Sequence, residues 1–323
     1  MKVLVTGGAG YIGSHTVQKL IEAGHYPVVF DNLSTGFRVA VPESVPLVVG
    51  DVRDMALVAK ALRDHQIEGV IHFAAKLVAP ESVEKPLEYY ENNVLGTIRV
   101  LEACKAAGVN KFIFSSTAAV YGNPKEFLVT EDVPTAPLNP YGASKLMSER
   151  VIQDGANAHD LRYVILRYFN VAGASLKGNN GQRTAGATSL IKVAGEVAAG
   201  KKDHVEIFGT DYPTPDGTGI RDYIHVDDLA DVHVLALESL NQESASHIYN
   251  VGYGHGFSVR DVIRAMQKVS GKQFAVKEGA RREGDPVGFV ADSTKAQKAF
   301  AWKPKCDNID LICKTTFEWE KSL

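Results

Sequence analysis

Tyr141 and Lys145 lie four residues apart in the stretch NPYGASK. Asn139 suits a helix N-cap and Pro140 the first helical position, so both side chains are expected one turn apart on one helix face. A tyrosine pKa of about 10 must fall by ~3 units, or ~4 kcal/mol, for proton transfer near pH 7. One cation about 5 Å away, at an effective dielectric constant of about 20, stabilises the phenolate by ~3 kcal/mol. An exposed tyrosine and a solvated lysine would give the same spacing, so the surroundings must decide.

Three hydroxyl residues precede this pair in the stretch FSSTAAVYG. Ser115, Ser116 and Thr117 stand at the end of the run 112–115, which we predict to be a strand. Ligands of parallel α/β sheets bind at the carboxyl ends of the strands. We therefore expect a hydroxyl of this run, with Thr117 as the candidate, to hydrogen-bond both a substrate oxygen and Tyr141.

Three glycines follow the first apolar run in VLVTGGAGYIG. Gly7, Gly10 and Gly13 come directly after the predicted strand 3–6 and at the start of a predicted helix, 11–23. Such glycines permit a tight turn, close approach of a phosphate and close packing of helix on strand. The helix N-terminus offers N–H groups to a pyrophosphate. The sequence therefore predicts a dinucleotide site, whose oxidised nicotinamide ring would add a second cation beside Tyr141.

Asp31 ends the second predicted strand, 18 positions after Gly13. A carboxylate there accepts hydrogen bonds from the adenosine ribose and repels a 2′-phosphate, which favours NAD over NADP. Arg38 follows within the same loop and is the one nearby residue able to offset this preference. Asp51, in GDVRD after the third strand, is placed to reach the adenine, although a turn aspartate explains it equally well.

Short apolar runs alternate with helical patterns through the first half of the chain. Further strands are predicted at 27–30, 46–49, 70–73 and 163–167, and a helix at 87–101. This alternation predicts an α/β fold, a doubly wound parallel sheet with helices on both faces. The pattern then becomes irregular, with helices predicted at 189–199 and 227–240. We expect a Rossmann-like domain at 1–169 and a smaller α/β substrate domain at 170–323, with a soft boundary that the chain is able to cross back over.

Composition narrows the class of protein. The 323 residues carry a net charge of −3, which argues against nucleic acid or an anionic membrane as a partner. The three cysteines form no CxxC pair and no ligand cluster, so neither disulfides nor a metal site is expected. No run is long enough to span a membrane, and the N-terminus has no signal-sequence pattern. We expect a cytoplasmic protein.

The motifs together resemble the extended short-chain dehydrogenase/reductases that act on nucleotide sugars, among them the NAD-dependent epimerases. The resemblance covers the whole chain and includes VTGGAGYIGSH, DNLSTG, FSSTAAVYG, PYGASK, LRYFNVAGA, RREGD and the more specific stretch DYPTPDGTGIRDYIHV. It implies tightly held NAD, a UDP-hexose substrate and a homodimer that buries the helices at about 87–107 and 141–155.

The resemblance also implies two sets of binding residues. The cofactor set comprises Gly7, Gly10, Tyr11, Ile12, Gly13, Asp31, Asn32, Asp51, Val52, Phe73, Ala74, Ala75, Asn92, Ser115, Tyr141, Lys145 and Tyr168. The nucleotide-sugar set comprises Thr117, Tyr141, Asn170, Ser189, Leu190, Phe208, Arg221, Arg282, Asp285 and Phe289. Paired arginines suit a diphosphate because each guanidinium donates two parallel bonds. The lysine that the family has after FAA is not assigned, because Lys76 is shifted and Leu77 occupies its place.

The residues after Thr117 bear on the reaction. Relatives that eliminate water or carbon dioxide from a 4-keto sugar carry acidic residues there, whereas this chain has Ala118 and Ala119. A 4-keto sugar in this site is expected only to be reduced again. If the sugar turns over first, the product is the C4 epimer, so the sequence predicts interconversion of UDP-glucose and UDP-galactose. A 4-epimerase of UDP-N-acetylglucosamine or a UDP-pentose is the alternative.

Two other classes of protein would share the glycine loop. A non-catalytic NAD sensor would not need Tyr141 and Lys145, which are both present, and an NADP-dependent reductase conflicts with Asp31. Among substrates, Phe289 aligns with the position beside the sugar, where a bulky ring disfavours a 2-acetamido group. We therefore expect UDP-galactose and UDP-glucose to be used well above the N-acetylated pair.

Overall fold

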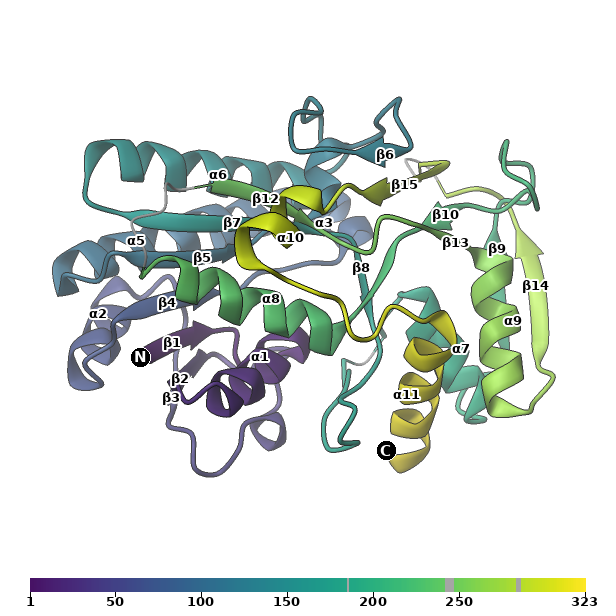
Figure 1. Cartoon of the computed structure of the whole chain (residues 1–323), viewed down its shortest axis with the longest axis horizontal. Helices are drawn as coiled ribbons and strands as arrows, with labels where there is room; N and C mark the ends of the chain where they lie inside the picture. The colour runs from purple at the N-terminus through teal and green to yellow at the C-terminus, as the bar shows by residue number, and fades with distance from the viewer. Residues whose placement is uncertain (185, 242–246, 283–285) are drawn as a thin grey trace.

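A computed structural model describes residues 1–184, 186–241, 247–282 and 286–323. Its largest element is a seven-stranded sheet in the order β12-β7-β5-β4-β1-β2-β3, in which every neighbouring pair runs parallel (Figure 1). The strands span β1 Lys2–Thr6, β2 Tyr26–Asp31, β3 Leu47–Val49, β4 Gly69–His72, β5 Lys111–Ser115, β7 Arg162–Tyr168 and β12 His247–Val251. The predicted parallel α/β fold is confirmed.

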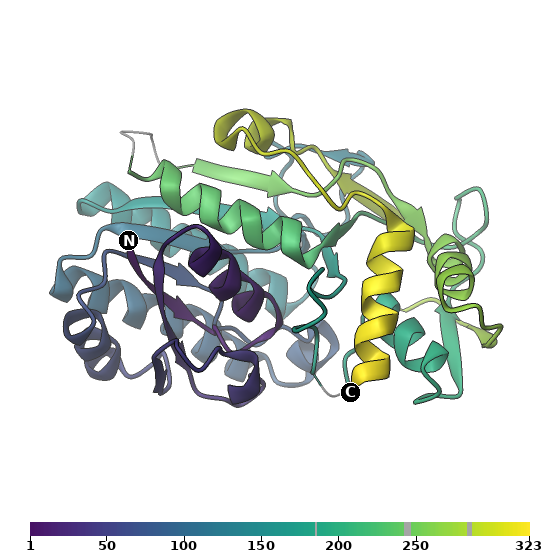
Figure 2. The ribbon, with the colours of Figure 1, turned by 60° about the horizontal axis from the view of Figure 1, so that its bottom comes forward.

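Helices cover both faces of this sheet because the strands are apolar on both sides. Val3 and Val5 of β1 point into one core, while Leu4 between them points into the other. The first face is covered by α1 and α8, which pack against each other, and the second by α2, α5 and α6 (Figure 2). These helices span α1 Tyr11–Glu22, α2 Met55–Asp64, α5 Gly96–Ala107, α6 Pro140–Ala158 and α8 Val226–Ser239.

The predicted helix 87–101 forms as three segments. It begins with α4 (Pro86–Tyr89), widens into a π-helical turn, η2 (Tyr90–Leu95), and continues as α5. The Asn93 carbonyl within the turn accepts hydrogen bonds from the hydroxyls of Thr97 (2.7 Å) and Ser148 (3.2 Å). A carbonyl engaged by side chains permits such a local widening, and π turns recur at functional sites.

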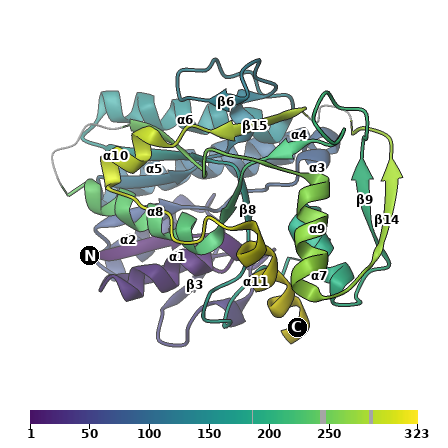
Figure 3. The ribbon, with the colours of Figure 1, turned by 45° about the vertical axis from the view of Figure 1, so that its right-hand side comes forward.

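The other part of the molecule is built from small sheets and short helices (Figure 3). One sheet has the order β13-β10-β15-β6, and β11-β8 and β14-β9 form two-stranded sheets. The strands are β6 Leu128–Val129, β8 Asn170–Ala172, β9 His204–Phe208, β10 Ile220–Arg221, β11 Tyr223–His225, β13 Phe257–Ser258, β14 Ala275–Gly279 and β15 Gly288–Ala291. The remaining helices are η1 Arg38–Ala40, α3 Ala79–Glu84, η3 Ala118–Tyr121, α7 Leu190–Ala198, α9 Val259–Ser270, α10 Thr294–Phe300 and α11 Ile309–Ser322.

The chain returns to the large sheet after leaving it. β12 adds to the edge beside β7, and α8 covers the same face as α1. Conversely, β6 from the first half joins the small sheet through β15. The division into 1–169 and 170–323 stays a prediction, while the strand pairing shows two crossings between the large and the small sheets.

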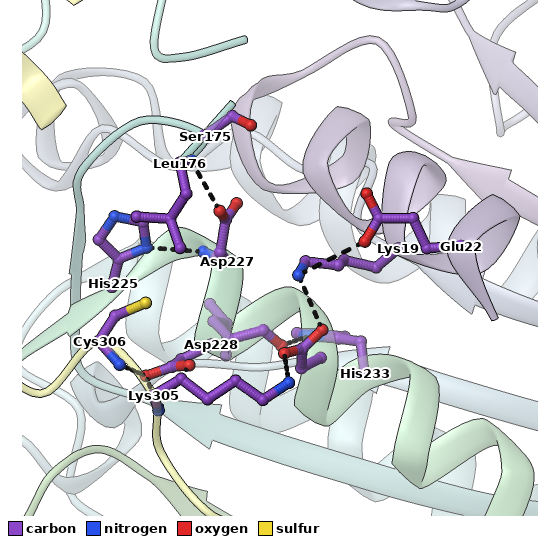
Figure 4. Close-up of polar contacts among 12 residues, drawn as sticks. Lys19, Glu22, Ser175, Leu176, His225, Asp227, Asp228, His233, Lys305 and Cys306 are labelled. Atoms are coloured by element: carbon purple, nitrogen blue, oxygen red, sulfur yellow. Dashed lines mark hydrogen bonds and ion pairs between the residues drawn. The ribbon is translucent and has the colours of Figure 1, made fainter. Parts of the chain in front are cut away.

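Buried carboxylates at the start of α8 fasten the two parts together (Figure 4). Asp227 accepts a hydrogen bond from the Leu176 backbone N–H at 3.0 Å. Asp228 accepts bonds from the backbone N–H groups of Lys305 (3.0 Å) and Cys306 (2.8 Å). These bonds attach the loop after β8 and the segment before α11 to a helix of the large sheet.

In the described part of the chain no helix is long and apolar enough to cross a bilayer. The three cysteines are buried and unpaired. Over the same residues, no group of three or more His, Cys, Asp or Glu side chains is arranged to hold a metal ion.

Candidate active site

The glycine loop between β1 and α1 forms a cradle in which side chains have no room. Gly7 has a φ of +71°, and a Cβ atom there would lie 2.7 Å from the Ala74 backbone nitrogen. A Cβ on Gly13 would lie 2.3 Å from the Gly7 carbonyl oxygen. Gly10 caps α1 without a side chain, which leaves the N–H groups of the first turn open to a ligand. A phosphate fits this cradle, since close backbone approach and the helix dipole both favour an anion.

Asp31 ends β2 beside the cradle, as expected. Its carboxylate is buried and accepts the backbone N–H groups of Ala9 (2.9 Å) and Leu33 (2.8 Å). Burial raises its pKa, and the two N–H bonds oppose the rise. The carboxylate therefore braces the loop and keeps lone pairs for a ribose hydroxyl. Arg38 donates to the Val41 carbonyl at 2.8 Å, and so is engaged within its own loop.

The predicted adenine side is arranged around Asp51. Its carboxylate is bound by the Arg53 side chain at 2.8 Å, which lowers its pKa to about 2, and also receives Asn32 at 3.4 Å. The neighbouring Val52 is buried in the core between the sheet and α2. Asn32, Asp51 and Val52 thus lie together, and the negative charge of Asp51 is already paired with Arg53.

The other predicted cofactor residues lie after β4, in the π turn and at the start of α1. Phe73, Ala74 and Ala75 directly follow β4, next to Gly7. Asn92 lies in the π turn, and its amide donates to the Asn93 side chain. Ile12 packs into the core below α1. The Tyr11 hydroxyl instead donates to the Gly173 carbonyl at 2.6 Å, so this side chain crosses to the far half of the chain.

The catalytic candidates converge at the carboxyl end of β5. Asn139 caps α6 by accepting the Gly142 N–H at 2.9 Å, with Pro140 in the first turn, so the predicted helix start is confirmed. The Thr117 hydroxyl lies near enough to Tyr141 to lower the pKa of its phenol. Ser115 donates to the Tyr168 hydroxyl at 3.0 Å. The strand-end hydroxyls and the catalytic helix therefore meet, although the roles assigned to them stay predictions.

Burial raises the pKa of Tyr141 and lowers that of Lys145, whereas attraction between a phenolate and an ammonium would do the opposite. Burial raises the pKa of Tyr141, against the lowering effect of the nearby Thr117 hydroxyl. Burial also lowers the pKa of Lys145 to about 7, against the raising effect of Glu149. Lys145 lies with its ammonium 4.2 Å from the centre of the Phe114 ring. The predicted lowering of the Tyr141 pKa depends on Lys145 and an oxidised nicotinamide ring together and stays a prediction, while within the chain itself burial is the largest influence on Tyr141.

A buried ionic network lies next to Tyr141 and Lys145, and the sequence alone did not predict it. Glu149, one turn beyond Lys145, receives Arg167 at 2.6 Å and the Ser116 hydroxyl at 2.5 Å. Arg167 also donates to the Tyr121 hydroxyl at 3.0 Å. The network ties α6 to the ends of β5 and β7. The repeat of Tyr141, Lys145 and Glu149 at intervals of four was the available signal.

Three predicted sugar residues lie around one buried carboxylate. Asp222 accepts backbone N–H groups of Tyr253, Gly254 and Ala291, and its own carbonyl accepts the Asn170 N–H at 3.0 Å. Arg221 lies next in sequence and pairs in register with Phe289. The Phe289 ring contacts the Phe169 ring at 5.2 Å in the cluster that includes Ala118. Asn170, Arg221 and Phe289 are thus brought near the loop after Thr117.

The remaining predicted sugar residues lie on α7, β9 and the segment after β14. Ser189 caps α7 without a side-chain cap bond, and Leu190 begins the helix. The exposed Arg282 stacks on Phe208, with 3.7 Å from its guanidinium carbon to the ring centre. Asp285 lies outside the described residues. The unassigned Lys76 pairs with Glu88 on the surface.

Comparisons with known proteins agree with this geometry. Residues 3–252 match the model of the NAD dependent epimerase/dehydratase family. The chain is 52% identical to a UDP-glucose 4-epimerase of Azospirillum brasilense, over 100% of the chain and 92% of that protein. It is similar to the structure of a UDP-glucose 4-epimerase of Bifidobacterium longum in complex with NAD⁺ and UDP (TM-score 0.94, 40% identity, 100% and 98% covered). It is also similar to a UDP-Glc/GlcNAc 4-epimerase of Campylobacter jejuni (TM-score 0.87, 48% identity, 100% and 99% covered).

Proposed function

The chain belongs to the NAD dependent epimerase/dehydratase family, and we propose that it interconverts UDP-glucose and UDP-galactose by inverting C4 of the hexose. The observation that carries this proposal is the packing of the loop after β5 against the start of α6, where a Cβ on Gly142, next to Tyr141, would lie 2.7 Å from the Ala119 carbonyl oxygen, with Ala118 and Ala119 directly after Thr117. This arrangement offers a group for proton exchange at one hydroxyl and provides no carboxylate directly after Thr117 for elimination. The reaction belongs to carbohydrate metabolism, at the step that makes or uses UDP-galactose.

Each catalytic residue has a role that its contacts support. Tyr141 takes a proton from the C4 hydroxyl and later returns one, while Thr117 orients both oxygens by hydrogen bonding. Lys145 places an ammonium one helical turn away, which favours the phenolate. NAD, when bound, supplies the acceptor and donor of hydride at C4, together with a positive charge beside Tyr141. The cradle of Gly7, Gly10 and Gly13 holds its pyrophosphate.

The UDP-sugar is held mainly through its nucleotide. Arg221 and Arg282 bind the diphosphate, because planar guanidinium groups match phosphate oxygens with paired bonds. Asn170, Ser189, Leu190 and Phe208 line the nucleotide side of this site. The hexose contacts Phe289 and the Thr117 loop, and few bonds to the sugar ring leave it free to turn over between the two proton transfers.

The test is to supply the purified protein with UDP-galactose alone. We expect UDP-glucose to form without net change in absorbance at the NADH band and without any added nicotinamide cofactor. Accumulation of a 4-keto or 4-keto-6-deoxy sugar would indicate a dehydratase instead. Bound NAD is measured separately, by chromatography of the supernatant after the protein is denatured.

We also propose that two copies associate through the helices that the resemblance implies, α4, α5 and α6, together with the neighbouring α3. The helices α3 and α4 pack against α6, and their apolar side chains Val83, Leu87 and Met147 are 64%, 79% and 48% exposed. A second copy would cover this face. Light scattering should give twice the chain mass of 34.9 kDa. Three unpaired, buried cysteines suit a reducing compartment, so we propose a cytoplasmic location, testable by cell fractionation.

A further inference from the structure

A small pocket beside the glycine loop is lined from both halves of the chain. Gly10, Tyr11 and Ser14 contribute the start of α1, and Thr35 contributes the loop after β2. Arg183 and Thr184 contribute the opposite wall, from the segment between β8 and α7. The pocket therefore brings an arginine of the distant half up to the open N–H groups of α1.

Arg183 lines this pocket and stacks on Trp319. Its Nε is buried and has no hydrogen-bond partner among the described residues. Its guanidinium carbon lies 4.7 Å from the centre of the Trp319 ring. Stacking on a ring engages the face of the guanidinium and leaves its N–H donors, which lie in the plane, available to an acceptor.

The backbone around Arg183 is fixed from both sides. On one side, a Cβ on Gly181 would lie 2.6 Å from Trp319, and the Trp319 indole N–H donates to the Gln182 carbonyl at 3.2 Å. On the other side, the Asn180 amide donates to the Ser14 hydroxyl at 2.9 Å. The segment is thus held between α11, which carries Trp319, and α1, which begins at the glycine loop.

We propose that Arg183 binds the pyrophosphate of NAD from the side opposite the N–H groups of α1, and that Trp319 of α11 holds it in place. The inference rests on the proposed function, because it assumes that the cradle binds a dinucleotide. A guanidinium and a helix N-terminus both select a phosphate anion. The C-terminal helix thereby controls how firmly the cofactor is retained.

The test uses the holoenzyme and the variant Arg183→Gln. The fraction of NAD that stays bound after prolonged dialysis is measured by chromatography, and the NAD dissociation constant is measured by calorimetric titration. We expect the variant to lose most of its NAD and its dissociation constant to rise roughly tenfold to hundredfold. Trp319→Leu keeps the arginine but removes its support, and should raise the constant by a smaller factor.

Arg282→Gln is the matched control, because Arg282 also stacks on a ring but belongs to the predicted sugar site. It should raise the KM for UDP-galactose and leave NAD retention unchanged. If Arg183→Gln retains NAD as the unmodified protein does, the proposal is overturned, whether or not the KM for the sugar changes. If Arg183→Gln fails to fold, Arg183→Lys decides in its place: weaker NAD binding supports the proposal, and equal binding overturns it. Failure of the proposed function is seen separately, as an unmodified protein that carries no NAD.

Discussion

The two halves of the predicted site are built in different ways. On the cofactor side, residues of the large sheet and its helices are fixed by burial: Lys145 and Glu149 are 3% and 1% exposed, and Gly13 has no room for a Cβ atom. On the sugar side, Asn170 and Arg282 lie exposed on small sheets and loops. A rigid, buried wall suits a cofactor that is retained through many turnovers, and an open wall suits a substrate that must enter, turn and leave.

Because of this difference, changes on the two sides of the site should be detected by different measurements. Changes on the cofactor side should alter turnover, the free energy of unfolding or the retention of NAD. Changes on the sugar side should alter the KM and the choice of sugar while the folded holoenzyme persists. A cofactor-side variant that alters only the KM or the choice of sugar would contradict the comparison. So would a sugar-side variant that alters NAD retention.

The largest effect is expected for Tyr141→Phe. The variant keeps the ring and loses the hydroxyl that exchanges the proton, so turnover of UDP-galactose should fall about 10²- to 10⁴-fold. NAD content and UDP binding should be unchanged, as chromatography and calorimetry would show. Near-normal turnover would mean that Tyr141 is only a half-buried residue at a helix start.

Glu149→Gln should destabilise the cofactor side, because it leaves the Arg167 guanidinium buried beside a neutral group. We expect the free energy of unfolding, measured in guanidinium chloride with saturating NAD, to fall by about 3–5 kcal/mol. The matched control on the same helix is Asp154→Asn, which breaks an exposed pair with Arg150 at 2.9 Å. Its cost should stay below about 1 kcal/mol. Equal losses in both variants would contradict the role given to burial.

Lys145→Met should change how stability depends on pH. Burial lowers the pKa of Lys145 to about 7 in the folded chain, whereas a lysine in the unfolded chain keeps its ordinary pKa of about 10.4. Between these values the unfolded state binds more protons, so this residue makes the folded state more stable as pH rises. From pH 7 to pH 9 the unmodified protein should gain about 2 kcal/mol relative to the variant. Parallel stability curves would show that Lys145 is not desolvated.

Phe289→Ala should have the smallest effect on turnover and act there mainly through the choice of sugar, although removing this buried ring also lowers the free energy of unfolding. The unmodified protein should use UDP-galactose well above UDP-N-acetylgalactosamine, and the variant should narrow the ratio of their kcat/KM values roughly tenfold. Phe300→Ala is the control, because both rings are 8% exposed but Phe300 packs on Tyr249 in the main core. Comparable kcat/KM values for the two sugars in the unmodified protein would refute this role of Phe289.

Much of the cofactor side was determined by the sequence alone, because local patterns carried the information. Apolar runs 112–115 and 163–167 predicted β5 and β7, since a strand buried on both faces must be apolar throughout. The glycines after β1, Asp31 at the end of β2 and the Asn139 cap followed from rules that involve neighbouring residues only. On the sugar side, assignment depended on family resemblance, because its short strands have no periodic pattern.

Only the tertiary structure decided the contacts between residues far apart in sequence. Arg167 contacts Glu149, Arg183 contacts Trp319, and Asp222 accepts N–H groups from the loop after β12 and from the end of β15. Spacing along the chain does not encode such pairs, since packing sets their distances. The same holds for the pKa of Tyr141, which rises with burial although a lysine lies one turn away. Spacing identified the groups able to exchange a proton, and burial determined their proton affinities.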